Sequence, residues 1–259
     1  MTRAIRSADA EFQVLDALRT NRQKRNRENA FLVEGVRNID AVFTHDWSVR
    51  SVLVSGGAKR SSWAEAICAR APDVVELDAP LFARLTAREE APEVVLVVQK
   101  RRPSLDEVVV HAGFVATVLD RPTYPGNIGT ILRSTDALGG SAVFTIGHGA
   151  DPYDPQSVRA STGSFFAVPI VEIDNADQLK SWATERGVHL VATDETGEPN
   201  LGAIPAPPVA LMLGNETAGL SRALREAADV TVAIAMSGSA SSLNVGAAHA
   251  IVLHAATNH

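Results

Sequence analysis

Short runs of apolar residues alternate along the chain with segments in which apolar residues recur every three or four positions. The runs are typical of strands, and the three-to-four spacing is typical of amphipathic helices. Up to about residue 100, this pattern predicts helices at Glu11–Arg19, Val36–Phe43, Ser61–Arg70 and Pro80–Thr86, and strands at Phe31–Gly35, Val49–Ser55, Asp73–Asp78 and Glu93–Gln99. Because the elements alternate, we expect a small α/β domain with helices over a sheet.

The remainder of the chain repeats the alternation with longer, more apolar strands. The pattern predicts strands at Phe114–Asp120, Ser141–Gly147, Val168–Ile173, Val188–Asp194, Val209–Gly214 and Val230–Ala235, and helices at Ile128–Leu138, Ala176–Arg186, Leu220–Ala228 and Leu243–His254. Such a series favours a mostly parallel sheet covered on both faces, although the strand order cannot be read from it. The charged segment Lys100–Ser104, broken by Pro103, predicts a boundary between domains 1–105 and 106–259.

The composition is that of a globular protein, with 46% hydrophobic and 21% charged residues. No apolar stretch is long enough to span a membrane, and the first residues lack the apolar core of a secretory signal. The single cysteine, Cys68, excludes a disulfide framework and favours a reducing environment. We therefore expect a cytoplasmic protein without a membrane partner.

Charge is distributed unevenly along the chain. Residues 1–105 hold 17 basic and 14 acidic side chains, a net charge of +3, whereas residues 106–259 hold 7 and 16, a net charge of −9. Five basic residues fall within nine positions of the first part: Arg19, Arg22, Lys24, Arg25 and Arg27. This run suits either a patch for a polyanion such as RNA or a solvated loop, and the sequence favours neither.

The segment after the strand Phe114–Asp120 is the first candidate for chemistry. Prolines and Gly126 end the strand, Asn127 stands where a helix N-cap belongs, and Arg133 leaves the apolar face of the following helix. Both side chains would share the carboxyl edge of the sheet, where open α/β sheets bind ligands. Taken alone, the segment equally suits an ordinary capped helix with an exposed Arg133–Asp136 pair.

Two further loops follow strand ends. In Leu211–Leu224 a buried strand runs into Gly214 and Glu216, and in Ile234–Ala256 a serine-rich loop leads to Ser242 and Asn244 at the start of the last helix. A glutamate beside a glycine can accept a ligand's hydrogen bonds, and a helix N-terminus can hold an oxygen-rich ligand. Both loops also suit ordinary helix-start residues. Fingerprints for nucleotide-binding loops, serine hydrolases and zinc proteases are absent, and the scattered histidines predict no metal site.

Together the three loops resemble a known family. Asn127-x-Gly129-x-x-x-Arg133, Leu213-Gly214-Asn215-Glu216-x-x-Gly219-Leu220, and Ile234-x-Met236 with Ser241–Val245 are similar, in order and spacing, to the motifs of the SpoU (TrmH-type) RNA ribose 2′-O-methyltransferases of the SPOUT superfamily. The segments RPTYPGNIG, YDPQSVRASTGS and GNETAGLS carry the same resemblance. FLVEGVRNIDAVF, from Phe31 to Phe43, resembles the opening of the L30e-like RNA-binding domain of its rRNA-modifying members.

The resemblance implies a fold and a site. The catalytic domain would be a SPOUT-type parallel sheet with a C-terminal trefoil knot, preceded by an L30e-like domain, and would work as a homodimer with S-adenosylmethionine (SAM). In the family, an arginine of one subunit reaches its partner's site. Similarity assigns catalytic or substrate-positioning roles to Asn127, Arg133, Glu216, Ser242 and Asn244, and cofactor binding to Thr193, Gly214, Ile234, Met236 and Leu243. Ala235 and Gly246 depart from the usual proline and serine, and we expect the site to tolerate both.

The added N-terminal domain favours 23S rRNA as the substrate, since minimal tRNA-modifying members lack it. Alternatives are a tRNA 2′-O-methyltransferase and a non-catalytic RNA-binding or ribosome assembly factor on the same fold. We expect Arg133 to stabilise developing negative charge rather than to accept a proton, because an arginine pKa above about 12 disfavours a base. The resemblance leaves open whether methylation confers antibiotic resistance.

Overall fold

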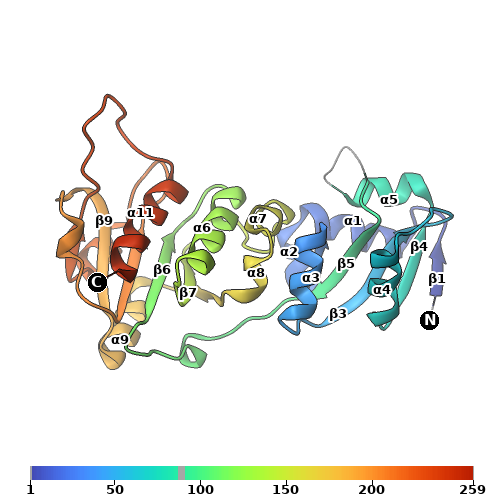
Figure 1. Cartoon of the computed structure of the whole chain (residues 1–259), viewed down its shortest axis with the longest axis horizontal. Helices are drawn as coiled ribbons and strands as arrows, with labels where there is room; N and C mark the ends of the chain where they lie inside the picture. The colour runs from blue at the N-terminus through green and yellow to red at the C-terminus, as the bar shows by residue number, and fades with distance from the viewer. Residues whose placement is uncertain (1, 87–90, 259) are drawn as a thin grey trace. The chain divides into compact units, whose positions relative to one another are not determined.

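The computed structural model describes residues 2–86 and 91–258, which form two compact units (Figure 1). The first unit consists of Met1–Arg101 and Tyr153–Phe166, and the second of Arg102–Pro152 and Ala167–His259. The chain passes from the first unit to the second after Arg101 and returns to the first unit for fourteen residues, Tyr153–Phe166. Among the described helices, none has the length and apolar character needed to cross a membrane.

The first unit contains a mixed five-stranded sheet in the order β1-β4-β3-β5-β2. Its elements are β1 (Thr2–Ile5), α1 (Ala10–Thr20), α2 (Arg22–Glu28), β2 (Ala30–Glu34), α3 (Val36–Thr44), β3 (Val49–Ser55), α4 (Ser62–Arg70), β4 (Val74–Leu77), α5 (Ala79–Leu85) and β5 (Val94–Gln99), with α7 (Pro155–Ser161) and α8 (Ser164–Ala167) from the returning segment. The predicted α/β alternation is confirmed. The pattern missed β1 and α2, because one is very short and the other carries almost no apolar residue.

The returning segment completes an aromatic cluster of the first unit. Phe31 of β2 packs edge-on against Trp47 and Tyr153, with ring centroids 6.0 and 5.0 Å apart, and Phe165 lies 5.5 Å from the same ring. The Trp47 indole Nε1 donates a hydrogen bond of 3.0 Å to the carbonyl oxygen of Phe166. Residues 153–166 are therefore part of this unit's core rather than a surface connection.

The second unit contains a parallel six-stranded sheet in the order β11-β9-β10-β6-β7-β8. Its elements are η1 (Leu105–Glu107), β6 (Val115–Asp120), α6 (Pro125–Ala137), β7 (Ala142–Ile146), β8 (Ile170–Ile173), α9 (Ala176–Arg186), β9 (His189–Glu198), η2 (Leu201–Ala203), β10 (Val209–Leu213), α10 (Arg222–Ala227), β11 (Val230–Val232) and α11 (Val245–Thr257). The predicted strands are present and parallel, so the predicted α/β class with a parallel sheet is confirmed.

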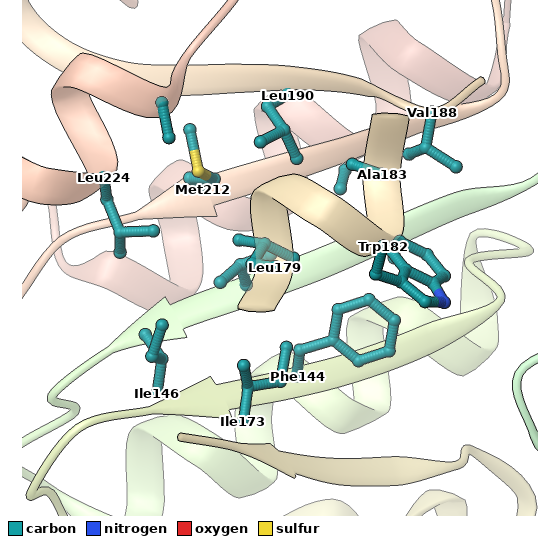
Figure 2. Close-up of a cluster of buried hydrophobic side chains, with 14 of the residues drawn as sticks. Phe144, Ile146, Ile173, Leu179, Trp182, Ala183, Val188, Leu190, Met212 and Leu224 are labelled. Carbon is teal, nitrogen blue, oxygen red and sulfur yellow. The ribbon is translucent and has the colours of Figure 1, made fainter. Parts of the chain in front are cut away.

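Helices cover both faces of this sheet. On one face Leu179, Trp182 and Ala183 of α9 pack over β7 and its neighbours, as Figure 2 shows for Phe144 and Met212. On the other face α11 packs against α6, β10 and β6. The buried side of α11 consists of Gly246, His249, Val252, Leu253 and Ala256. Ile251 lies outside that side and is 41% exposed, because α11 is apolar almost all round.

Helix α6 begins earlier than the sequence predicted. Pro125 occupies its first turn, where the fixed φ of proline favours a helix start. Asn127 is consequently inside the first turn and is not the N-cap, which is Tyr124. The side chain of Asn127 is thereby released from capping and is available to other groups.

Candidate active site

The carboxyl ends of four neighbouring parallel strands form one edge of the second unit. Leu213 at the end of β10 pairs with Leu119 of β6 on one side and with Thr193 of β9 on the other. β11 lies beyond β9. Because strands of one direction end together, the loops carrying the three sequence motifs begin at this edge.

A buried ion pair fastens the loop after β6 to the loop after β10. The carboxylate of Asp120, 3% exposed, accepts hydrogen bonds from the Arg121 guanidinium at 2.9 and 3.0 Å and from the backbone N–H of Ser221 at 2.5 Å. Arg121 also donates to the carbonyl of Gly219 at 3.2 Å, and Asn215 Nδ2 donates to the carbonyl of Arg121 at 2.7 Å. Arg121 has φ +49°, a conformation that the bonds of its guanidinium and of its own carbonyl hold in place.

Sequence reasoning missed Asp120 and Arg121. Their only local signal is a charged pair directly after an apolar strand, which is common at strand ends. Their role depends on partners about a hundred residues away.

One residue from each motif joins a single hydrogen-bond network. Asn127 Nδ2 donates to Glu216 Oε1 at 2.9 Å, and Asn244 Nδ2 donates to Asn127 Oδ1 at 3.2 Å. Glu216 Oε2 also accepts from the backbone N–H of Thr123 at 3.0 Å, and the Asn244 side chain caps α11 through the N–H of Gly246 at 2.9 Å. The structure therefore brings together Asn127, Glu216 and Asn244. Asn127 and Glu216 line a small recess together with Leu119, Gly214 and Val245.

The environment of Glu216 keeps this carboxylate ionised. Partial burial acts to raise its pKa, but the hydrogen bonds donated by Asn127 and Thr123 outweigh that effect, and the pKa of Glu216 lies below its ordinary value. A carboxylate with a low pKa is a poor proton acceptor at neutral pH. Glu216 is therefore suited to orienting Asn127 rather than to general base catalysis.

Arg133 and Ser242 lie apart from this network. Both side chains are exposed, and neither forms a hydrogen bond or ion pair with residues 2–86 or 91–258 of its own chain. Arg133 follows Asn127 by six positions on α6, which places it about 9 Å further along the helix and about 240° around it. Within one chain, then, the predicted catalytic set is only partly assembled.

The predicted cofactor residues lie within β9, directly after β10, and in the segment between β11 and α11. The Thr193 hydroxyl is buried and has no hydrogen-bond partner among the described residues. Gly214 lies against the backbone of its own loop, where a Cβ would meet Gly219 and Leu220 at 2.2 Å. Ile234 is half-buried. Met236 and Leu243 belong to the long loop between β11 and α11 (Figure 1) and are 41% and 40% exposed.

These residues fit SAM. The unpaired buried hydroxyl of Thr193 offers a polar contact, and the exposed apolar side chains of Met236 and Leu243 offer a surface for an adenine ring. Pockets for small ligands likewise combine a few polar groups with apolar walls. The substitutions Ala235 and Gly246 leave this arrangement intact, since Ala235 is exposed and Gly246 receives the cap from Asn244. No group of three or more metal-ligating side chains occurs in the described ranges.

The five basic residues between Arg19 and Arg27 lie in α1 and α2, and they are not all exposed as a surface patch for RNA would require. Arg27 is 74% exposed, but Lys24 is only 15% exposed and pairs with Glu28 at 3.0 Å. Arg19 and Arg22 are half-buried.

Arg25 contradicts the expectation of an RNA contact. Its side chain is 2% exposed, donates to the carbonyl of Leu18 at 2.9 Å, and faces Asp154 of the returning segment at 3.5 Å. Arg25 is a structural residue, because its charge is satisfied inside the unit and cannot reach an RNA phosphate.

Comparison with known proteins agrees with this geometry. Residues 115–254 match the SpoU rRNA Methylase family, and residues 9–97 match the SpoU L30e-like domain. The chain is 43% identical to the 23S rRNA (uridine(2479)-2′-O)-methyltransferase of Streptomyces viridochromogenes, over 98% of this chain and 91% of that protein. It is 28% identical to the 23S rRNA (guanosine(2553)-2′-O)-methyltransferase RlmP of Bacillus subtilis, over 90% of each.

Among solved structures, the SpoU methyltransferase AviRb from Streptomyces viridochromogenes in complex with AdoMet matches with a TM-score of 0.91 and 42% identity. The match covers 96% of this chain and 97% of that chain. The family that the three motifs indicated is confirmed. The chain belongs to the SpoU rRNA methylase family and is an RNA methyltransferase.

Proposed function

We propose that this protein transfers the methyl group of SAM to a ribose 2′-hydroxyl in 23S rRNA. Two relatives that match along both units are named 23S rRNA 2′-O-methyltransferases, and a similar structure holds AdoMet. The observation within the chain that carries the proposal is the Asn127–Glu216–Asn244 network, because it joins one residue from each family motif at one edge of the sheet.

The cofactor is held by residues within β9, directly after β10, and in the segment between β11 and α11. Thr193 supplies a hydroxyl, Gly214 and Ile234 supply main chain, and Met236 and Leu243 supply apolar surface. When bound, SAM supplies an electrophilic methyl group. The protein's own task is then to align a weak nucleophile and to stabilise the charge that develops on it.

Asn127, Ser242 and Asn244 orient the acceptor ribose, and Glu216 fixes the amide of Asn127 by accepting its N–H. Arg133 stabilises the developing alkoxide and the adjacent phosphate. It acts as a cation and hydrogen-bond donor rather than as the base, because a guanidinium has no acceptor to take a proton.

Arg133 acts on the site of a second copy of the chain, in a homodimer. The distance of Arg133 from the network of its own chain supports this arrangement. So does the outer face of α11, where Ile251 is exposed on a helix without Asp, Glu, Lys or Arg. An apolar helix face of this kind is typical of an interface.

The C-terminal segment forms a trefoil knot by threading the loop that follows β10. The supporting observation is that α11 packs over β10 and β6, although it follows β11 on the far side of β9. The domain boundary lies near residue 105, with residues 153–166 contributed back to the first domain.

The first domain supplies affinity for RNA, in the cytoplasm where ribosomes are made. Arg27 and the partly exposed Arg19, Arg22 and Lys24 contribute positive charge at its surface, whereas Arg25 does not. Neutralising Arg27 and Arg22 should therefore flatten the salt dependence of RNA binding without changing affinity for SAM.

The test is to incubate the purified protein with SAM and unmodified transcripts of 23S rRNA and tRNA, and to map 2′-O-methylated positions. We expect one site in 23S rRNA. Methylation of tRNA alone would favour the tRNA enzyme. An RNA complex without calorimetric binding of SAM would indicate a non-catalytic factor.

Arg133→Lys tests the role of the guanidinium. We expect a loss of about 10²–10³ in turnover, the usual cost of one charge-stabilising donor. Nearly full activity with an unchanged pH profile would exclude bidentate stabilisation by Arg133.

A further inference from the structure

Tyr124 is the one Phe, Tyr or Trp side chain of the described residues that is clearly exposed. It is 61% accessible, while the others are buried or half-buried. Its phenol forms no hydrogen bond with residues 2–86 or 91–258. An aromatic ring left in water next to a catalytic network has a contact to gain from another molecule.

The backbone of Tyr124 is held beside the network. The carbonyl of Tyr124 accepts the N–H of Asn127 at 3.0 Å, and the preceding N–H of Thr123 donates to Glu216 at 3.0 Å. The Thr123 hydroxyl accepts a hydrogen bond from Asn215 Nδ2 at 2.8 Å. Pro125 follows directly and restricts the backbone of Tyr124 further. The backbone that carries the ring is therefore already ordered, three residues from Asn127.

We propose that Tyr124 is a stacking platform for an unpaired nucleobase of the RNA at or next to the acceptor ribose. This inference rests on the proposed function and adds a substrate contact to it. Proteins that act on single-stranded or unstacked RNA commonly stack its bases on an aromatic face, and this contact tolerates any base.

Charge explains why an uncharged contact is needed here. Residues 106–259 carry 7 basic and 16 acidic side chains, and Glu216, which accepts the backbone N–H of the preceding Thr123, stays ionised. Phosphates gain little attraction from such a surface. Stacking supplies affinity that does not depend on charge.

The test compares Tyr124→Phe, Tyr124→Leu and Tyr124→Ala with wild type, and uses Val109→Ala as a control at another exposed apolar residue, 78% accessible. Binding of an unmodified 23S rRNA transcript is measured with S-adenosylhomocysteine present, and kcat/KM is measured with saturating SAM. Tyr124→Phe and Val109→Ala should match wild type within about twofold. Tyr124→Ala and Tyr124→Leu should weaken RNA binding and kcat/KM by about 5- to 150-fold, the usual effect of one lost base–aromatic stack.

Two further readouts separate stacking from a structural role. The dependence of binding on salt should keep its slope in all variants, because no phosphate contact is lost. Calorimetric affinity for SAM and the molar mass by light scattering should not change. The inference would be overturned if the Leu and Phe variants had equal activity, or if the Ala variant bound RNA as well as wild type. It would also be overturned if the loss of RNA binding followed a change in SAM affinity or in molar mass.

The binding assay keeps this inference distinct from the proposed function. If wild type binds the transcript but methylates nothing, the proposed function fails, and the Tyr124 variants still test stacking through affinity alone. If wild type methylates rRNA and the variants bind normally, only the inference about Tyr124 fails. If wild type does not bind the transcript, the inference is overturned.

Discussion

A buried histidine in α11 should make the second unit sensitive to mild acid. His249 is completely buried, and its two ring nitrogens each share a hydrogen bond of 2.8 Å with a hydroxyl, Nε2 with Thr117 of β6 and Nδ1 with Ser134 of α6. A neutral imidazole needs one donor and one acceptor, and two hydroxyl groups can supply both. Burial disfavours the charged ring and lowers the pKa of His249 from 6.5 to about 4.

The direction and size of the effect follow from this shift. The unfolded chain binds a proton at His249 more tightly than the folded chain does. The contribution of the neutral His249 ring to the free energy of unfolding is therefore fully present above pH 6.5 and is lost as the pH falls toward 4. A shift from 6.5 to about 4 corresponds at most to about 3 kcal/mol of unfolding free energy, and to about 2 kcal/mol between pH 7 and pH 4.5.

The assay is urea unfolding of wild type, His249→Gln and His254→Gln at pH 7, 6, 5 and 4.5. Gln retains a donor and an acceptor but does not titrate. His254 is an exposed histidine of the same helix and serves as the matched control. Between pH 7 and pH 4.5, His249→Gln should lose about 2 kcal/mol less stability than wild type and than the control. Three parallel pH profiles would refute the argument, whatever the stability of each protein at pH 7.

Three further substitutions test the site and its support. Glu216→Gln should lower turnover at least about tenfold with little change in Tm, because the neutral amide of glutamine holds the two hydrogen-bond donors less strongly than the carboxylate does. An unchanged kcat would exclude an orienting role for Glu216. Gly214→Ala should abolish soluble folded protein, because its Cβ would lie 2.2 Å from backbone atoms. Gly126→Ala has open space around the new Cβ and should fold normally. Equal Tm values for the two variants would contradict the predicted clash at Gly214. Arg25→Met should lower the free energy of unfolding by about 3 kcal/mol, because a buried carbonyl and a carboxylate lose their partner. Arg27→Ala should change the free energy of unfolding by less than about 0.5 kcal/mol. The reverse order in thermal unfolding would place the RNA-facing charge at Arg25.

Hydrophobic periodicity predicted most of the elements because their cause is local. The strand β3 runs from Val49 to Ser55 as predicted, and α6 has the expected apolar face. The segment 153–166 was not predicted as part of the first unit, because its short helix α7 has no strong pattern of its own. Its place depends on contacts with Phe31 and Trp47, more than a hundred residues earlier.

The basic run shows where composition misleads. Charge alone treats five neighbouring basic residues as equivalent, but a helix directs them to different sides. In α2 the turn places Arg25 inward, where backbone carbonyls and Asp154 satisfy it, and leaves Arg27 in water. The partners that receive Arg25 include a carboxylate 129 positions away, and no local pattern contains that information.

The Asn127–Glu216–Asn244 network depends on strand order rather than on any one motif. Asn127, Glu216 and Asn244 are separated by 89 and 28 positions along the chain, and each motif by itself suits an ordinary helix start. They meet because β10 lies directly beside β6 and because α11 returns to pack on α6 after the chain has passed β11 at the sheet edge. A sheet ordered as in the sequence would separate β6 from β10 by three strands, about 19 Å in total, and no asparagine–glutamate hydrogen bond spans that distance. The resemblance to a family anticipated the network because it carries the topology along with the residues, whereas spacing along the chain does not.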